Sequence, residues 1–200
     1  MIILASNNKG KLRELSETLA PLNIELKPQS AFQIPEADET GLSFIENAIL
    51  KARNASQYVD HPVIADDSGL IVPALNGQPG IYSARYAGIG ATDQQNIDFL
   101  LQKMQSIEDR RAYFYCVLAM MKHKQDPTPI IAVGSWYGEI LLTQRGAEGF
   151  GYDPIFYLPQ LQKTAAELTK EQKNKISHRS IACQHLFQSL SENMKYEHRI

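Results

Sequence analysis

The chain has 200 residues, with 20 lysines and arginines against 22 aspartates and glutamates, which gives a formal net charge of −2. This length suits a single domain, or two lobes that share a core, and no repeat or linker marks a firm boundary within residues 1–200. The nearly neutral charge argues against stable binding to a nucleic-acid backbone, although a local cluster of charges could still bind a small anion.

Two features predict a cytoplasmic protein that does not associate with membranes. Residues 1–5 form a short apolar run without a preceding basic segment, and no other stretch is long and apolar enough to cross a bilayer. Cys116 and Cys183 lie in apolar segments and lack the spacing of metal ligands. They are therefore predicted to be buried free thiols, as is usual in a reducing compartment.

The first third of the chain predicts one buried strand and two helices. Residues 2–5 have the apolar pattern of a buried strand, and residues 11–19 that of a helix ended by Pro21. Ser43 and Glu46 form a capping-box pattern that opens a second helix, which extends to about residue 58. The apolar face of this helix is predicted to comprise Phe44, Ile45, Ala48, Ala52 and Ala55. A polar line beside that face comprises Asn47, Lys51 and Asn54.

The remaining two thirds predict alternating strands and helices. Thr92 opens a helix that buries Ile97, Leu100, Leu101 and Met104, and the last helix begins after Ser177. One side of that last helix carries Ile181, Ala182, His185, Leu186, Ser189 and Leu190. Residues 63–65 are predicted to form a strand that is followed by an apolar segment at 70–75, and residues 112–121 have the pattern of a central strand. Residues 130–142 predict one or two more strands, broken near Gly138. This interleaving predicts an α/β fold with a mixed sheet and flanking helices.

Adjacent carboxylates, Asp66 and Asp67, follow the apolar run at residues 63–65 and precede Ser68 and Gly69. Neighbouring carboxylates repel each other unless one is hydrogen-bonded to the frame and the other meets a cation. At the end of a strand they could form a site for a hard metal ion. Asp, Ser and Gly are also common turn residues, so a solvated turn is the alternative.

The segment from Ser6 to Lys11 connects a predicted strand to a predicted helix. Free backbone N–H groups and the helix dipole can bind a phosphate at such a place, and two lysines add positive charge. The segment is not a P-loop, because Ala5 and Leu12 stand where that motif has glycine and serine or threonine. An ordinary strand-to-helix connection is the alternative.

A second acidic pair, Asp38 and Glu39, precedes the helix that starts near Ser43. Acidic residues near a helix start often only complement the helix dipole. If this pair folds beside Asp67, however, the two loops together supply the one or two carboxylates that a magnesium ion typically takes. Lys51 could bind the same phosphates, or it could pack its stem on the core and keep its ammonium in water.

Two further segments could recognise a base. Residues 149–154 combine two aromatic rings, two glycines and a carboxylate, which could stack on a flat base or simply fill the edge of the core. Lys173, His178 and Arg179 place cationic or titratable groups near a helix start. Positive charge there opposes the helix dipole, and such a local conflict is expected at a functional site.

Taken together, these motifs resemble the XTP/dITP diphosphatase family, which includes inosine triphosphate pyrophosphatase. The matching segments occur in the family's order along nearly the whole chain. They are residues 6–11, 39–47, 64–70, 79–86, 149–154 and 177–179. Departures are conservative, such as Ser6 where threonine is frequent and Asn76 where glycine is frequent.

The resemblance implies hydrolysis of ITP, dITP and XTP to the monophosphate and pyrophosphate, with Mg²⁺ as cofactor and a homodimer as the usual assembly. It implies an elongated α/β fold with two lobes around a central substrate cleft. Asp67 becomes the general base and a metal-associated carboxylate, and either Asp38 or Glu39 the second metal carboxylate. Asp66 is then expected to be a framework residue that holds the turn.

The implied substrate-binding residues fall into two sets. Those expected at the phosphates are Ser6, Asn7, Asn8, Lys9, Gly10, Lys11, Lys51 and Ser68. Those expected at the base and sugar are Phe150, Gly151, Tyr152, Asp153, Lys173, His178 and Arg179. Two alternatives stay open: a pyrophosphatase for another modified nucleotide, such as a pyrimidine, and a nucleotide sensor that binds without turnover.

Overall fold

The computed structural model describes residues 1–20 and 23–197, with side chains up to residue 192. Pro21, which was expected to end the first helix, lies outside the described residues. The strands form one mixed sheet in the order β2-β1-β3-β4-β5-β6-β7. β1 pairs in parallel with β2 and β3, whereas β6 is antiparallel to β5 and β7. The predicted α/β class with a mixed sheet and flanking helices is therefore confirmed.

The secondary structure alternates along most of the chain. The strands are β1 (Ile2–Leu4), β2 (Leu26–Pro28), β3 (Val63–Ile71), β4 (Arg111–Met121), β5 (Ile130–Ile140), β6 (Phe156–Leu158) and β7 (Lys163–Thr164). The α-helices are α1 (Lys9–Leu19), α2 (Phe44–Ala55), α3 (Asp93–Lys103), α4 (Lys170–Ile176) and α5 (His178–Glu197). No helix in the described part of the chain is long and apolar enough to span a membrane.

Polar caps fix where the predicted helices begin. The Ser43 hydroxyl accepts a hydrogen bond from Glu46 N, and the Glu46 carboxylate accepts one from Leu42 N. Thr92 and Gln95 form a reciprocal capping box at the start of α3, which buries Ile97 and Leu100 as predicted. These caps satisfy backbone N–H groups that the first turn of a helix leaves without a partner.

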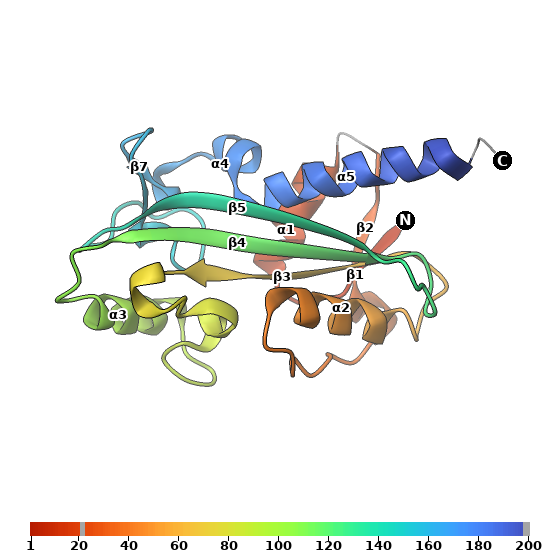
Figure 1. Ribbon diagram of the computed structural model, residues 1–200, viewed down its shortest axis with the longest axis horizontal. Coiled ribbons are helices and arrows are strands. Elements are labelled where there is room, and N and C mark those ends of the chain that lie inside the picture. Colours follow the sequence, from red (N-terminus) through yellow and green to blue (C-terminus); the bar gives the residue numbers. More distant parts are fainter. Residues whose placement is uncertain (21–22, 198–200) are drawn as a thin grey trace. The chain divides into compact units, whose positions relative to one another are not determined.

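The chain divides into two compact units, and β3, β4 and β5 contribute residues to both. The first unit comprises residues 1–67 and 116–134 and the chain from His178 on. In this unit, α1 and α5 cover one face of the sheet and α2 covers the other (Figure 1). Its core includes Leu4, Leu15, Leu118 and Leu186.

The second unit comprises residues 68–115 and 135–177. Its core is rich in aromatic rings, with Phe156 packed 4.5 Å from Phe114 and 5.3 Å from Trp136 between ring centroids. β5 continues through Gly138 to Ile140, so the predicted break there is wrong. A Cβ atom at Gly138 would clash with Tyr157 and Phe156, so this glycine allows close packing inside the strand rather than ending it.

Several predicted faces and boundaries also need correction. Ile45 was expected in the core but is 40% exposed, whereas Asn47, expected beside the apolar face, is completely buried. The helix α2 ends at Ala55 instead of continuing to residue 58. On α5, His185 is exposed, whereas Cys183, which was not assigned to the inner side of this helix, is buried in the core. Cys116 and Cys183 are buried free thiols, as predicted.

Candidate active site

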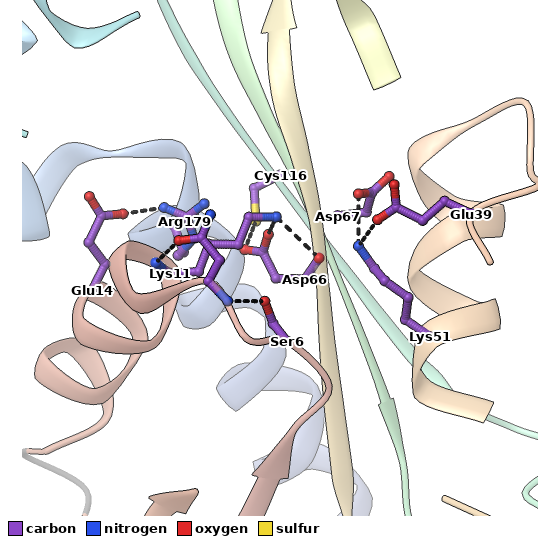
Figure 2. Close-up of polar contacts among 10 residues, drawn as sticks. Ser6, Lys11, Glu14, Glu39, Lys51, Asp66, Asp67, Cys116 and Arg179 are labelled. Carbon is purple, nitrogen blue, oxygen red and sulfur yellow. Dashed lines mark hydrogen bonds and ion pairs between the residues drawn. The ribbon is translucent and has the colours of Figure 1, made fainter. Parts of the chain in front are cut away.

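Asp66 and Asp67 lie in the middle of β3, so the predicted strand end and Ser-Gly turn at this point are wrong. Successive side chains of a strand point to opposite faces of the sheet. Figure 2 accordingly shows Asp66 on the side of α1 and Asp67 on the side of α2. Both side chains are buried, with relative exposures of 0% for Asp66 and 6% for Asp67. The strand thereby gives two adjacent carboxylates separate surroundings.

Asp66 is the centre of a buried ion cluster in the first unit. Lys11 Nζ lies 2.5 Å from Asp66 Oδ1, and Arg179 Nε donates to Oδ2 at 2.7 Å. The Cys116 thiol also donates to Oδ2, at 3.3 Å. Arg179 forms a second ion pair, with Glu14 of α1 (Figure 2). Each buried charge in the cluster therefore has an opposite charge beside it, as burial requires.

The electrostatics of this cluster keep Asp66 ionised. Burial alone would raise the pKa of Asp66, but the charges of Arg179 and Lys11 outweigh burial and hold that pKa well below 3.8. Burial, together with the charge of Asp66, raises the pKa of the Cys116 thiol well above its ordinary value. Asp66 is thus a permanent acceptor that ties α1 and α5 to β3, which supports its expected framework role.

Asp67 forms a second cluster, with side chains of α2 and of the segment before α2. Lys51 Nζ donates to Asp67 Oδ1 and to Glu39 Oε1, each at 2.9 Å (Figure 2). Asp67 Oδ2 is buried and accepts no hydrogen bond from the described residues. A buried carboxylate oxygen without a donor is unfavourable in a fold, and it marks the atom at which a ligand would be stabilised.

The two aspartates also differ in the direction of their pKa shifts. Burial raises the pKa of Asp67, helped by the charge of Glu39, and the attraction of Lys51 and Lys11 does not overcome it. Burial would lower the pKa of Lys51, but the charges of Asp67 and Glu39 reverse this and raise it. Asp67 is therefore the carboxylate of the pair that can exchange a proton, next to a lysine that stays charged.

The carboxylates of Asp67 and Glu39 are placed so that they could hold a divalent metal ion. They already share one cation, the Lys51 ammonium, and one buried oxygen of Asp67 has no donor among the described residues. No group of three or more His, Cys, Asp and Glu side chains in the described chain is arranged to hold a metal ion. Magnesium often takes only one or two carboxylates and completes its shell with phosphate oxygens and water. The pair could therefore hold a metal ion whose remaining ligands are water or phosphate oxygens.

The segment from Ser6 to Lys11 leads from β1 into α1, which begins at Lys9, earlier than the predicted residue 11. Asn8 is the N-cap, and its side chain accepts a hydrogen bond from Lys11 N at 3.0 Å. The residues of this segment are all at least partly exposed: Ser6, Asn7, Asn8, Lys9, Gly10 and Lys11. The positive end of the helix dipole and the backbone N–H groups of the first turn make such a helix start suitable for binding a phosphate.

The second unit contains the aromatic loop that was predicted to bind a base. The Asp153 carboxylate accepts from Phe150 N at 2.9 Å and from Lys173 Nζ at 2.6 Å. Lys173 Nζ also lies 5.0 Å from the centre of the Phe150 ring. Asp153 and Lys173 are buried, whereas Phe150 is partly exposed. The buried ion pair thus holds a partly exposed ring in place.

Other members of this loop are tied to the rest of the second unit. The Tyr152 hydroxyl donates to Ser83 O at 2.9 Å, and Gly151 N donates to Asp93 Oδ2 at 2.7 Å. Burial, followed by the nearby Tyr86 and Asp93, raises the pKa of Tyr152, so the hydroxyl keeps its proton and acts as a donor. These contacts shape the loop itself, and they give Tyr152 a structural role.

Three further residues that were predicted to belong to the site make none of the contacts described above: Asp38, Ser68 and His178. Asp38 is exposed, whereas its neighbour Glu39 is the carboxylate that meets Lys51. Ser68 follows Asp67 in β3 and is half-buried, and His178 is buried at the first position of α5. The predicted conflict with a helix dipole is wrong for Lys173, which lies in the last turn of α4, where a positive charge is favourable.

Sequence reasoning assigned no role in the site to three buried polar residues of the first unit: Glu14, Asn47 and Cys116. Glu14 lies one turn after Lys11, beside the apolar line of α1, so a buried ion partner could have been suspected there. Asn47 lies one turn before Lys51 on α2, and its side chain accepts from Gly41 N. Nothing in the pattern of β4 distinguishes Cys116 from an ordinary apolar core residue.

The chain is similar to known proteins over nearly its whole length. The model of the Ham1 family matches residues 2–189. A protein of Legionella pneumophila (strain Lens) named dITP/XTP pyrophosphatase is 57% identical over 187 residues, covering 92% of this chain and 95% of that protein. One of the same name from Nitrosomonas europaea is 53% identical, covering 96% of this chain and 95% of that protein.

Solved structures agree with this similarity. The structure of a HAM1 protein from Coxiella burnetii aligns with a TM-score of 0.88 at 49% identity, covering 96% of this chain and 98% of that one. The Staphylococcus aureus Ham1 protein aligns with a TM-score of 0.85 at 45% identity, with the same coverage of both chains.

Proposed function

Because the chain belongs to the Ham1 family, we propose that it hydrolyses the non-standard purine nucleoside triphosphates ITP, dITP and XTP to the nucleoside monophosphate and pyrophosphate. The observation that carries this proposal is the environment of Asp67. It is a buried carboxylate with a raised pKa, one oxygen on Lys51 and the other without a donor among the described residues. Removing such nucleotides would keep the nucleotide pool free of them.

Asp67 and Glu39 would hold Mg²⁺ in this proposal, with Glu39 chosen over Asp38 because only Glu39 of the two meets Lys51 within the described contacts. When bound, the metal ion would neutralise charge on the triphosphate. Asp67 would accept a proton from the attacking water or orient it, which its raised pKa favours. Attack at the α-phosphate releases pyrophosphate as the leaving group.

The phosphates would be bound by positive groups of the first unit. Lys51 stays charged beside Asp67, and the first turn of α1 offers backbone N–H groups after the Asn8 cap. Positive groups placed where charge develops on the departing pyrophosphate stabilise the transition state. Lys11 would contribute to this from its position on Asp66.

The base would be recognised by the second unit, where Phe150 offers a partly exposed ring and Lys173 a positive charge beside it. A donor aimed at the purine O6 favours hypoxanthine and xanthine over adenine, which carries an amino group there. Arg179 was expected to serve the base, but its guanidinium lies 2% exposed between two carboxylates. We therefore assign Arg179 to the support of Asp66.

The products of ITP incubated with the protein and Mg²⁺ test the proposed function. We expect IMP and pyrophosphate, because attack at the α-phosphate cleaves between the α- and β-phosphates. IDP with inorganic phosphate would contradict the proposal. A preference for dTTP or UTP over ITP and XTP would favour a pyrimidine pyrophosphatase, and tight binding without products would favour a sensor.

The pH dependence of activity gives a second test, through Lys51. Asp67 must be ionised to accept a proton, so kcat/KM falls as the pH decreases through the pKa of Asp67 in the free enzyme. Burial raises this pKa and Lys51 partly lowers it. Lys51→Met is therefore expected to move the acid limb of the kcat/KM profile to higher pH. Lys27→Met, at an exposed surface ion pair with Glu25, should leave the limb in place. An acid limb that shifts to lower pH in Lys51→Met would contradict the assignment.

Two further features belong to the proposal. A homodimer is implied by the family resemblance, and sedimentation of the purified protein would test it. A cytoplasmic location is supported by the two buried free thiols, which suit a reducing compartment.

A further inference from the structure

We propose that Asn47 is a positioning residue for the Glu39 carboxylate. In this inference Asn47 fixes the short segment from Glu39 to Gly41 against α2, and so sets where the Glu39 carboxylate lies relative to Asp67. The inference rests on the proposed function, because it takes Glu39 and Asp67 as the carboxylates that hold the metal ion.

Hydrogen bonds attach this segment to α2 at two points. Asn47 Oδ1 accepts from the backbone N–H of Gly41 at 2.9 Å, and Asn47 is 0% exposed. One helical turn later, Lys51 Nζ donates to Glu39 Oε1 at 2.9 Å. Residues four apart on a helix lie on the same side, so one face of α2 holds both the backbone and the carboxylate of the segment.

The packing at Gly41 shows how close this contact is. A Cβ atom at Gly41 would lie 2.6 Å from Glu46 Cβ and 2.7 Å from Asn47 Oδ1, too near for either to be tolerated without movement. The next backbone N–H, of Leu42, donates to Glu46 Oε2 at 3.0 Å. The segment is therefore placed by α2, and a glycine is needed where its backbone touches the helix.

Packing alone does not account for Asn47. Its Nδ2 atom is buried and donates no hydrogen bond within the part of the chain that the structure describes. A buried donor without an acceptor destabilises a fold, and a leucine of similar size would avoid that loss. An asparagine at this position is understandable if its oxygen is needed to hold the carboxylate segment, since functional sites keep such local costs.

The contact can be broken from both sides, by Asn47→Leu and by Gly41→Ala. The probe is Mn²⁺ alone, titrated into the whole protein and followed by the EPR signal of free Mn²⁺. We expect each variant to weaken Mn²⁺ binding by about 10- to 100-fold, as for residues that orient a metal ligand. Both changes break the same contact, between Gly41 and Asn47. The Mn²⁺ affinity of the double variant should therefore be no lower than that of the single variant with the lower affinity.

The control is Asn54→Leu, the same change on the same helix. Asn54 Nδ2 donates to Pro35 O at 2.8 Å, so this variant also loses a bond to the preceding segment, but at a point away from Glu39. Its Mn²⁺ affinity should equal that of the wild type. Urea unfolding of every variant identifies any that loses affinity through a general loss of structure.

The remaining outcomes separate the inference from the proposed function. Glu39→Gln should weaken Mn²⁺ binding, and adding Asn47→Leu to it should weaken binding little further. If Glu39→Gln loses affinity while Asn47→Leu and Gly41→Ala keep it, the inference is overturned and the metal site stands. If Glu39→Gln binds Mn²⁺ as the wild type does, the metal role of Glu39 is wrong, and the inference is overturned with it.

Discussion

Asp67→Asn is expected to reduce ITP turnover by about 10²- to 10⁴-fold, the contribution typical of a general base, while the protein stays folded. The substitution keeps the shape of the side chain and an oxygen that can accept from Lys51. It removes the charge that burial disfavours, because the pKa of Asp67 is raised in the folded protein. The unfolding free energy of the variant at neutral pH should therefore be no lower than that of the wild type.

The measurement is steady-state ITP hydrolysis at saturating Mg²⁺, paired with urea unfolding of the same preparation. Asp60→Asn is the matched control, because Asp60 is exposed just before β3 and belongs to neither ion cluster. Turnover by Asp67→Asn at the wild-type rate would remove Asp67 from the mechanism. A rate loss that merely parallels a loss of folded protein would assign it to the framework.

Asp66→Asn is expected to lower the unfolding free energy by about 3–5 kcal/mol, as when one partner of a buried ion cluster is removed. The variant removes the negative charge beside the buried guanidinium of Arg179, which keeps its ion pair with Glu14, and it removes the ion pair of Lys11. Asp66 and Arg179 are buried, so water cannot reach the positive charge that has lost its carboxylate partner. Urea unfolding at neutral pH measures this loss. Asp109→Asn, at an exposed ion pair with Arg111, should change stability little.

The unfolding free energy lost in Asp66→Asn should become smaller as the pH falls. The folded-state pKa of Asp66 lies well below 3.8, because the charges of Arg179 and Lys11 outweigh the burial that would raise it. Its contribution is complete above the unfolded-state pKa and is lost as the pH falls through the folded-state pKa. The stability curves of the wild type and of Asp66→Asn should therefore converge on acidification. A constant difference down to strongly acidic pH would show that the charge of Asp66 is not what stabilises the fold.

The fold class could be predicted because local signals agree with it. The caps at Ser43 and Thr92 set the starts of α2 and α3, and the apolar run of β4 has the pattern of a central strand. The course of β3 could not be predicted, because Asp66 to Gly69 are residues typical of turns and rare in strands. Their strand conformation depends on partners far away in the sequence, such as Lys11 and Arg179, which neutralise Asp66.

The meeting of Asp67, Glu39 and Lys51 was predictable from the motifs, but the arrangement of the residues around them was not. Asp67, Glu39 and Lys51 are brought together as the motifs suggested. The position of Arg179 was not predictable, because its partner Glu14 lies 165 residues away and only the packing of α1 beside α5 joins them. The separation of Asp66 from Asp67 follows from strand alternation, which becomes visible only once β3 is known to be continuous.

The separate roles of the two aspartates are tested most directly by the unfolding free energies of Asp66→Asn and Asp67→Asn, measured side by side in metal-free buffer at neutral pH. A large loss in Asp66→Asn and none in Asp67→Asn is the predicted result, because the ionised Asp66 stabilises the buried charges of Arg179 and Lys11, whereas burial disfavours the charge of Asp67. Equal losses in the two variants would contradict it. They would mean that both carboxylates support the fold and that neither is reserved for chemistry.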